Sequence, residues 1–246
     1  MPAYEHLGAR YSAVRSEEPR IARQVHAALG DAQRIVNIGA GTGNYEPRDR
    51  RVVAVEPSPT MLRQRPSDAA PALQAVAESL PFAARSFDAS MAILTLHHWS
   101  DLDRGLAELR RVAPRQVVFF FEPLVTVDFW LLEYFPEVAA LPTEINAPGI
   151  AEIGQVLDIR AIQAIDVPPD CTDGFGAAYW ARPAAYLDPL VQGGISSLAL
   201  LTDEARQAGT RRLAEDLDSG RWQERHGHHL QQEVFDGGYR LAIAGA

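Results

Sequence analysis

The sequence predicts a doubly wound α/β fold with a largely parallel sheet. Short apolar runs alternate with amphipathic segments along the first half of the chain. The first run, residues 34–38, opens into a glycine-rich segment at 39–43, and the second run, residues 52–55, ends on Glu56. Strands that alternate with helices form parallel sheets covered on both faces. The glycines and the acid then lie at the carboxyl edge of the sheet, where such folds bind ligands.

Each further element has its own local signal. Residues 17–29 carry apolar side chains at helical spacing before a glycine. Residues 101–112 are predicted to be a helix, with Ser100 as N-cap and Asp103 as the acid of a capping box. The remaining predicted strands are residues 72–76, 86–94, 117–121, 161–167 and 239–243, and the remaining predicted helices are residues 150–157, 175–180, 183–201 and 202–217.

These elements suggest four parts. Residues 1–30 form an N-terminal helical flap, residues 31–167 the α/β core, residues 168–230 a helical insertion, and residues 231–246 the final strand of the core sheet. The insertion separates the sixth and seventh strands, so it lies at the rim where ligands bind. We therefore expect it to be a lid or an acceptor pocket.

Composition limits the function classes. A net charge of −9 argues against nucleic acid as a partner, because phosphate binding needs a basic face. No apolar run reaches the roughly 18 residues of a membrane span, and residues 1–20 do not resemble a signal peptide. The single cysteine, Cys171, cannot form an internal disulfide, which suits a reducing compartment. We expect a cytoplasmic protein, monomeric or homodimeric, without a membrane partner.

Two absences exclude specific chemistries. All 23 Lys and Arg residues are arginine, which excludes a P-loop lysine, a Schiff-base lysine and the Tyr-x-x-x-Lys motif of short-chain dehydrogenases. His226, His228 and His229 lack a cysteine or glutamate at ligand spacing, so we expect a solvated loop and no metal.

The glycine loop and Glu56 together predict a nucleoside-binding site. A loop without side chains lets the backbone approach a ligand closely, and a strand-terminal carboxylate can accept hydrogen bonds from both ribose hydroxyls. Position 44 is Asn, so the Gly-x-Gly-x-x-Gly pattern of nicotinamide dinucleotide sites is not met.

Later motifs complete a family pattern. The order is Gly-x-Gly-x-Gly at 39–43, Glu-x-Ser-x-x-Met-Leu at 56–62, Ala-Glu-x-Leu-Pro-Phe at 77–82, Ser-Phe-Asp at 86–88 and His-His-Trp at 97–99. It resembles the class I S-adenosylmethionine-dependent methyltransferases, in their small-molecule, type 11-like branch, over roughly residues 10–122. The resemblance implies a Rossmann-like, doubly wound sheet of seven strands, mostly parallel with an antiparallel last strand, plus a helical lid. It also implies S-adenosyl-L-methionine as cofactor, S-adenosyl-L-homocysteine as product, and a small-molecule acceptor such as a secondary metabolite.

The resemblance also assigns cofactor contacts. A tyrosine at position 11 would cover the sulfonium, Arg15 would meet the cofactor carboxylate, and Met61 would lie against the adenine, although ordinary core packing explains Met61 equally well. The full set of expected cofactor-binding residues is Tyr11, Arg15, Asn37, Gly39, Ala40, Gly41, Gly43, Glu56, Pro57, Met61, Ala77, Glu78, Leu94 and Thr95.

The chain departs from the family pattern in two places. Asn37 stands where these enzymes mostly carry Asp or Glu, which keeps an acceptor but loses the charge. Only residues 44–51 separate Gly43 from the second strand, which is too short for the usual first helix. We expect a turn there, with Tyr45 or Glu46 filling the gap.

Catalytic and acceptor residues are less constrained. His97 or His98 could act as a general base, given an ordinary pKa near 6.5, or could cap the following helix. Neighbouring side chains on an extended segment point opposite ways, so at most one histidine should face the site. Carboxylates near aromatic side chains would suit an amine or cationic acceptor, although the same residues fit turns and packing. The expected acceptor residues are Trp130, Asp170, Asp173, Tyr179 and Arg182.

Three functions therefore remain open. The first is methyl transfer from S-adenosylmethionine to an O, N or C atom of a small molecule. The second is a cofactor-binding protein of the same fold that does not methylate, either regulatory or reused for a cyclisation. The third is a nicotinamide-dependent oxidoreductase, which Asn44 and the missing lysine disfavour.

Overall fold

The computed structural model describes residues 15–126 and 129–245, so the predicted flap residue Tyr11 lies outside the described residues. The chain divides into two compact units, each of which is formed by three separate segments of the sequence. The sheet unit comprises residues 19–123, 147–165 and 238–246, and the helical unit comprises the residues up to 18, 124–146 and 166–237. Residues 124–146 thus cluster with the predicted insertion, and residues 19–30 with the core.

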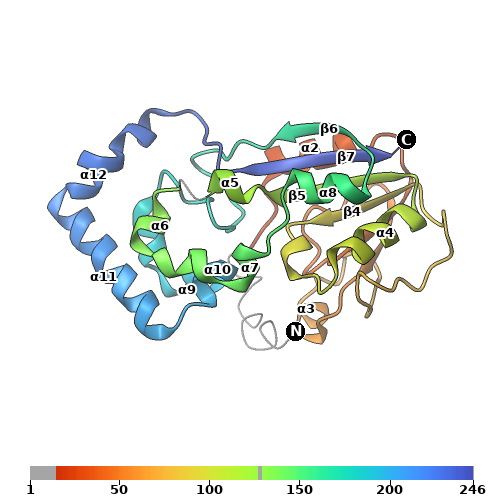
Figure 1. Ribbon diagram of the computed structural model, residues 1–246, viewed down its shortest axis with the longest axis horizontal. Coiled ribbons are helices and arrows are strands. Elements are labelled where there is room, and N and C mark those ends of the chain that lie inside the picture. The colour runs from red at the N-terminus through yellow and green to blue at the C-terminus, as the bar shows by residue number, and fades with distance from the viewer. Residues whose placement is uncertain (1–14, 127–128, 246) are drawn as a thin grey trace. The chain divides into compact units, whose positions relative to one another are not determined.

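The sheet unit is built on a seven-stranded sheet in the order β3-β2-β1-β4-β5-β7-β6 (Figure 1). The first five strands pair in parallel, and β7 is antiparallel to both of its neighbours, β5 and β6. This confirms the predicted Rossmann-like sheet with an antiparallel last strand. The strands are β1 (Arg34–Ile38), β2 (Arg51–Val55), β3 (Ala72–Leu73), β4 (Ala89–Ile93), β5 (Arg115–Phe121), β6 (Ile159–Ala164) and β7 (Tyr239–Gly245).

Several strand limits differ from the predicted ones. The third strand is two residues long because it lies at the sheet edge and pairs only with the end of β2. The fourth strand begins at Ala89 because Asp88 uses its carboxylate to accept from the backbone N–H groups of Gln33 and Arg34. The sixth strand runs over 159–164 where residues 161–167 were predicted.

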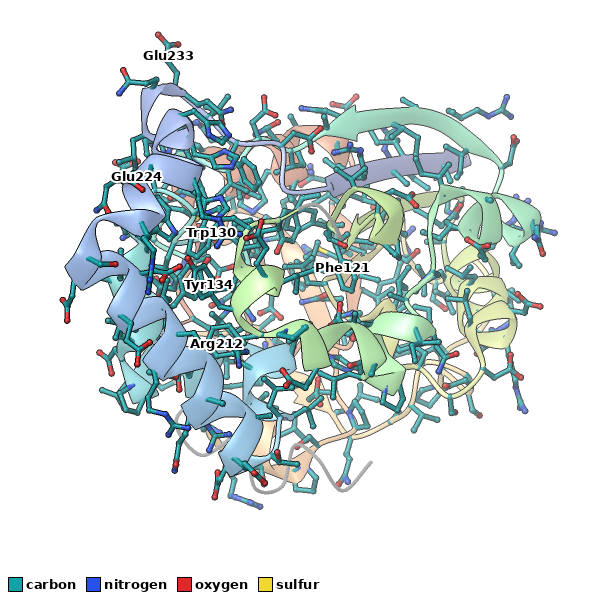
Figure 2. The ribbon with its side chains drawn as sticks, turned by 60° about the vertical axis from the view of Figure 1, so that its left-hand side comes forward. Phe121, Trp130, Tyr134, Arg212, Glu224 and Glu233 are labelled. Atoms are coloured by element: carbon teal, nitrogen blue, oxygen red, sulfur yellow. The ribbon has the colours of Figure 1, made fainter. Side chains whose placement is uncertain are left out.

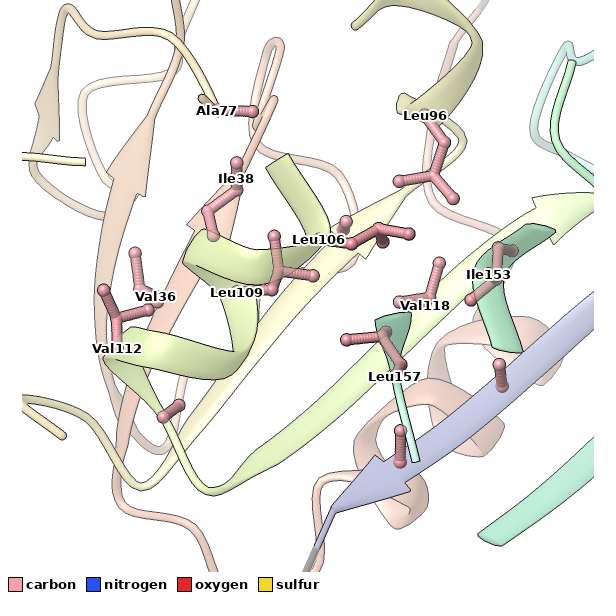
Figure 3. Close-up of a cluster of buried hydrophobic side chains, with 14 of the residues drawn as sticks. Val36, Ile38, Ala77, Leu96, Leu106, Leu109, Val112, Val118, Ile153 and Leu157 are labelled. Atoms are coloured by element: carbon pink, nitrogen blue, oxygen red, sulfur yellow. The ribbon is translucent and has the colours of Figure 1, made fainter. Parts of the chain in front are cut away.

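Helices cover both faces of the sheet. On one face lie α4 (Leu102–Val112) and α8 (Ile150–Val156), and on the other lies α2 (Pro19–Ala28) (Figure 1). In α4 the buried side chains of Leu106, Leu109 and Val112 recur at helical spacing and pack against strand residues such as Val118 (Figure 3). Fully burying one such side chain is worth about 1.5–3 kcal/mol, so this face anchors the strands that carry the site.

The N-cap of α4 is Asp101, not Ser100 as predicted. The Asp101 carboxylate accepts a hydrogen bond of 3.0 Å from the backbone N–H of Arg104. The hydroxyl of Ser100 is turned towards Glu78, to which both it and the Ser100 N–H donate. Two short elements complete the site edge: α3 (Pro59–Arg63), capped by Ser58, and the 3-10 turn η2 (Leu96–His98).

The helical unit packs around aromatic side chains. The side chains of Trp130, Trp180, Trp222 and Tyr186 are among the largest fully buried ones. Its elements are α6 (Leu131–Tyr134), η3 (Pro136–Ala140), α7 (Pro142–Ile145), η4 (Pro183–Leu187), α9 (Pro189–Gly194), α10 (Ser196–Ala199), α11 (Asp203–Ser219), α12 (Arg221–His226) and η5 (Gly227–Gln231), with α5 (Pro123–Thr126) where the chain enters it.

The predicted helices of this unit are partly wrong. Residues 175–180 form turns, and residues 183–201 break into three short pieces because Pro189 starts one piece and a pair of glycines ends it. The prediction at 202–217 holds, as α11 begins after Thr202. Within the part of the chain that the structure describes, no helix is long and apolar enough to cross a membrane.

Candidate cofactor site

Three glycines shape the loop at the carboxyl end of β1, and each is needed for a different reason. All three have a left-handed backbone, with φ of +68° at Gly39, +53° at Gly41 and +99° at Gly43. A Cβ on Gly39 would lie 2.1 Å from the hydroxyl of Thr95, and one on Gly43 would lie 3.2 Å from a carboxylate oxygen of Glu46. A Cβ on Gly41 would meet nothing within 4 Å. Only Gly41 borders open space, so it is where a ligand can approach the backbone.

Glu56 follows β2 and faces this loop. Its side chain is buried, and its two carboxylate oxygens accept from the backbone N–H groups of Gly41 at 2.8 Å and Ser58 at 2.9 Å. Burial raises the pKa of this carboxyl, and the two backbone donors offset part of the rise. Each carboxylate oxygen can accept more than one hydrogen bond, so Glu56 retains capacity for two hydroxyl donors.

Two buried polar atoms at the loop have no hydrogen-bond partner. They are Oδ1 of Asn37 and the hydroxyl oxygen of Thr42. The amide of Asn37 has a fixed orientation, because its Nδ2 donates to the Glu46 carboxylate at 3.0 Å and its oxygen must therefore point away. An unpaired buried polar atom costs about 1–3 kcal/mol, and such atoms are rare in folded proteins. Their presence beside Gly41 indicates a site shaped for a polar ligand.

The segment after the glycines is a turn, as predicted from its length. Residues 44–50 contain no helix, and Tyr45 and Glu46 are both buried in the space. Tyr45 takes φ +66° and packs edge-on against Phe119, with ring centroids 6.2 Å apart. Glu46 forms an ion pair of 2.7 Å with Arg65.

The end of β4 brings a strained residue to the same edge. Leu94 has a left-handed backbone with φ +49°, which costs a non-glycine residue about 1–2 kcal/mol. Its N–H donates to the carbonyl of Phe119 at 2.7 Å, and the next residue, Thr95, packs against Gly39. Such strain concentrates at functional sites, so Leu94 and Thr95 remain predicted cofactor contacts.

His97 and His98 lie in η2, and their rings touch, with centroids 3.8 Å apart. The prediction that they point opposite ways is wrong, because a 3-10 turn replaces the extended segment on which that prediction depended. Both side chains are half-buried, and the His97 ring also contacts Phe121. Their role as a base stays a prediction.

Glu78, Met61 and Ala77 serve the structure of the sheet unit. One carboxylate oxygen of Glu78 accepts from the N–H and hydroxyl of Ser100 and from the N–H of Asp101. Burial favours a higher pKa for Glu78, but these hydrogen bonds outweigh it and lower the pKa. Met61 and Ala77 are buried, Ala77 within the apolar core. Cofactor contact by these three residues remains a prediction.

Asp173 does not fit its predicted role as an acceptor ligand. Its side chain is 0% exposed and forms a two-point pair with Arg15, at 2.6 Å to Nε and 3.3 Å to Nη2. A small molecule cannot touch a carboxylate that is buried and paired in this way. The predicted contact of Arg15 with a cofactor carboxylate would require this pair to open.

Trp130 packs in the aromatic core of the helical unit, and its contact with an acceptor remains a prediction. Its side chain is 2% exposed, and its Nε1 donates to the carbonyl of Trp180 at 3.2 Å. Its ring packs edge-on against Trp222 and Tyr186. Figure 2 shows Trp130 and Tyr134 near Arg212 of α11, whose guanidinium donates to the backbone carbonyl of Tyr134.

The other three predicted acceptor residues differ in their surroundings. The Arg182 guanidinium lies 4.7 Å from the centre of the Tyr179 ring and donates to the carbonyls of Cys171 and Ala178. The face of the Tyr179 ring that was predicted to contact a substrate amine is therefore occupied by the guanidinium of Arg182. Asp170 is exposed. In residues 15–126 and 129–245 no cluster of three or more His, Cys, Asp or Glu side chains could hold a metal ion.

Two residues of the site were not predicted, Thr42 and Arg65. Thr42 could have been found, since a polar residue between two glycines of a ligand loop has few structural reasons to be there. Arg65 could not, because its partner Glu46 is 19 residues away in the chain.

Comparison with known proteins finds a domain match in the sheet unit. The family described as "Methyltransferase domain" matches residues 36–121, which hold the glycine loop, Glu56 and the end of β4. The sheet unit therefore contains a segment similar to a methyltransferase domain, within a Rossmann-like sheet. The acceptors at this site, Glu56, Asn37 and Thr42, fit the hydroxyl and amino donors of S-adenosylmethionine.

Two relatives place this methyltransferase more closely. A putative methyltransferase from an antibiotic biosynthesis pathway of Anabaena variabilis superposes with a TM-score of 0.87 at 29% identity, covering 95% of this chain and 99% of that one. The malonyl-acyl-carrier-protein O-methyltransferase of Erwinia pyrifoliae is 40% identical over 93 residues, or 35% of this chain and 36% of that one. The methyltransferase thus spans about a third of the length of this curated relative.

A third similarity concerns the fold alone. The cyclase SpnF shares the fold with a TM-score of 0.56 at 16% identity, covering 99% of this chain and 92% of that one. The same architecture therefore serves a protein named for a cyclisation. Function has to be argued from the site and not from the fold.

Proposed function

We propose that this protein transfers the methyl group of S-adenosyl-L-methionine to an O, N or C atom of a small molecule. The observation that carries the proposal is the set of unused acceptors around Gly41: the Glu56 carboxylate and the unpaired oxygens of Asn37 and Thr42. S-adenosylmethionine carries the matching donors, two ribose hydroxyls and two amino groups. The matched methyltransferase domain favours this cofactor over a nicotinamide dinucleotide.

The bound cofactor would supply an activated methyl group on a sulfonium, and the chain's residues would hold and orient it. Glu56 would accept from the ribose hydroxyls, Asn37 and Thr42 would accept from the remaining donors, and Gly41 would allow close approach of the backbone. Alignment of the reacting atoms and exclusion of water can supply about 7–11 kcal/mol of the barrier in well-oriented systems. His97 or His98 would remove a proton where the acceptor is a hydroxyl or an ammonium.

The Anabaena relative supports a small-molecule acceptor of the secondary-metabolite kind, since its similarity covers nearly the whole of both chains. The malonyl-carrier relative covers too little of either chain to define an acceptor. A net charge of −9 supports a site without nucleic acid. We propose a cytoplasmic enzyme that works as a monomer or homodimer, which light scattering on the purified chain would distinguish.

Calorimetry with three separate ligands tests the proposal. S-adenosylmethionine and S-adenosylhomocysteine should bind, and NADH should not. Binding of NADH without S-adenosylmethionine would overturn the proposal in favour of an oxidoreductase. Incubation with methyl-labelled S-adenosylmethionine and a panel of hydroxyl, amine and carboxylate acceptors then tests transfer. Binding without transfer to any acceptor of the panel would favour the non-methylating alternative.

A further inference from the structure

A buried ion pair fills the helix-free turn that follows the glycine loop. Glu46 lies in the turn 44–50 and Arg65 follows α3, and their side chains are only 7% and 6% exposed. One guanidinium nitrogen, Nη2, donates to both carboxylate oxygens of Glu46, at 2.9 Å and 2.7 Å. Removing two charges from water costs several kcal/mol per ion, and apolar residues often fill such a space with equal or better stability. Filling the space beneath the turn 44–50 therefore does not by itself explain why a charged pair is found there.

The pair reaches the glycine loop at three points. Nη1 of Arg65 donates to the carbonyl of Gly41 at 3.2 Å, and Glu46 accepts from Nδ2 of Asn37. Both side chains also lie against Gly43, where a Cβ would come within 3.2–3.3 Å of them. Asn37 carries one of the two unpaired oxygens, and Gly41 and Gly43 flank Thr42, which carries the other.

Gly41 is consequently held from both sides by charged groups. Its N–H donates to the carboxylate of Glu56, and its carbonyl accepts from the guanidinium of Arg65. Gly41 has no side chain to pack and takes φ +53°, so few other forces restrain its two peptide planes. Charge-assisted hydrogen bonds are roughly twice as strong as neutral ones, which suits them to this task.

We propose that the Glu46–Arg65 ion pair is the positioning element of the cofactor loop. It fixes the Gly41 carbonyl and orients the amide of Asn37, so that the loop is ordered before the ligand arrives. The statement that the ordered loop serves S-adenosylmethionine rests on the proposed function.

A purely structural staple is the competing explanation. Arg65 also donates to the carbonyl of Ala70, and the N–H of Ala70 donates to Glu46, so the pair joins the turn 44–50 to the segment after α3. If the pair had only this structural role, its loss would lower the stability of the protein but would not change the order of the glycine loop. A variant that removes both charges of the Glu46–Arg65 pair distinguishes the positioning role from the purely structural one, because it leaves no unpaired ion.

The double variant Glu46→Gln/Arg65→Met removes both charges of the pair. Glutamine retains an acceptor for Asn37, and methionine fills the space of the arginine stem, so folding should survive. The donor to Gly41 is lost. The matched control is Arg48→Met/Asp68→Asn, which removes an ion pair joining the same two segments whose side chains are 79% and 60% exposed.

The experiment measures amide hydrogen exchange over residues 39–43 in the ligand-free full chain, with thermal unfolding and S-adenosylhomocysteine calorimetry on the same samples. In Glu46→Gln/Arg65→Met we expect exchange to be about tenfold faster and the dissociation constant to be about tenfold higher, because preorganisation is lost. The unfolding midpoint should stay within about 4 °C of the parent. The control variant should match the parent in all three.

Parent-like exchange and affinity in Glu46→Gln/Arg65→Met would show that the pair is a staple and overturn the proposal. A parent chain that binds no S-adenosylhomocysteine would refute the proposed function instead. In that event the exchange rates of the ligand-free chains still decide whether the ion pair positions the loop.

Discussion

The glycine loop of the sheet unit and the aromatic core of the helical unit use polar side chains in opposite ways. At the loop, Asn37 and Thr42 keep unpaired oxygens, and Glu56 keeps spare acceptor capacity. In the helical unit, Asp173 and Arg182 use their charges on partners inside the protein. Buried acceptors without partners therefore locate a ligand site better than charges near aromatic rings do.

The comparison predicts its largest effect at Asp173. Asp173→Ala should lower the free energy of unfolding by about 3–5 kcal/mol, because it breaks a buried two-point ion pair with Arg15. Asp170→Ala, at an exposed position three residues earlier, should change it by less than about 0.5 kcal/mol. Urea denaturation measures both. Equal stability of the two variants would contradict a structural role for Asp173 and reopen its role in acceptor binding.

The next effect concerns the cofactor. Glu56→Gln should weaken S-adenosylmethionine binding by about 100-fold, since the glutamine NH2 must face one of the backbone donors and one charged acceptor is lost. Calorimetry gives the affinity, and circular dichroism shows whether the variant folds. Asp88→Asn, at the amino end of the sheet, is the control. Parent affinity in folded Glu56→Gln would remove the ribose role.

The glycines themselves test which loop position meets the ligand. Gly41→Ala has room for its methyl group in the ligand-free protein, but its left-handed backbone should cost about 1–2 kcal/mol of stability. It should also reduce cofactor affinity by about tenfold, because the methyl group takes space that the ligand needs. Gly39→Ala should destabilise folding by about 1–3 kcal/mol more than Gly41→Ala does, because its methyl group would also collide with Thr95. Calorimetry and urea denaturation on both variants separate the effects. A reversed pattern would place the ligand at Gly39.

The smallest effect is a pH dependence in the helical unit. Burial, together with the hydrogen bond from its hydroxyl to Asp216, raises the pKa of Tyr134 from 10.0 to about 12. The folded state therefore binds this proton more tightly than the unfolded state does. The resulting stability is complete below pH 10 and is lost as the pH rises towards 12. Tyr134→Phe should show a shallower loss of stability between pH 10.0 and about pH 12, and an unchanged slope would count against this account.

The sequence was most informative where a signal is local. The strand Arg34–Ile38 was predicted to the residue because a glycine loop bounds its apolar run. The turn after Gly43 followed from chain length, since residues 44–51 cannot hold a helix and two connections. These arguments need no knowledge of partners elsewhere in the chain.

The errors arose where two residues compete or where a partner is distant. Ser100 and Asp101 are both good N-caps, and only the position of Glu78 decides that Asp101 caps α4. The Asp173 side chain looked available because its partner Arg15 is 158 residues away. Tertiary contacts of this kind leave no pattern in a single sequence.

The position of β7 in the sheet has a consequence for how the chain folds as it is made. This strand, residues 239–245, is inserted between β5 and β6, and β6 pairs with no other strand. Until residues 239–245 emerge from the ribosome, β6 cannot join the sheet and one edge of β5 stays open. Exposed strand edges invite association between chains. The nascent chain therefore holds an incomplete sheet until its last strand is synthesised, and this interval is when a chaperone would help it most.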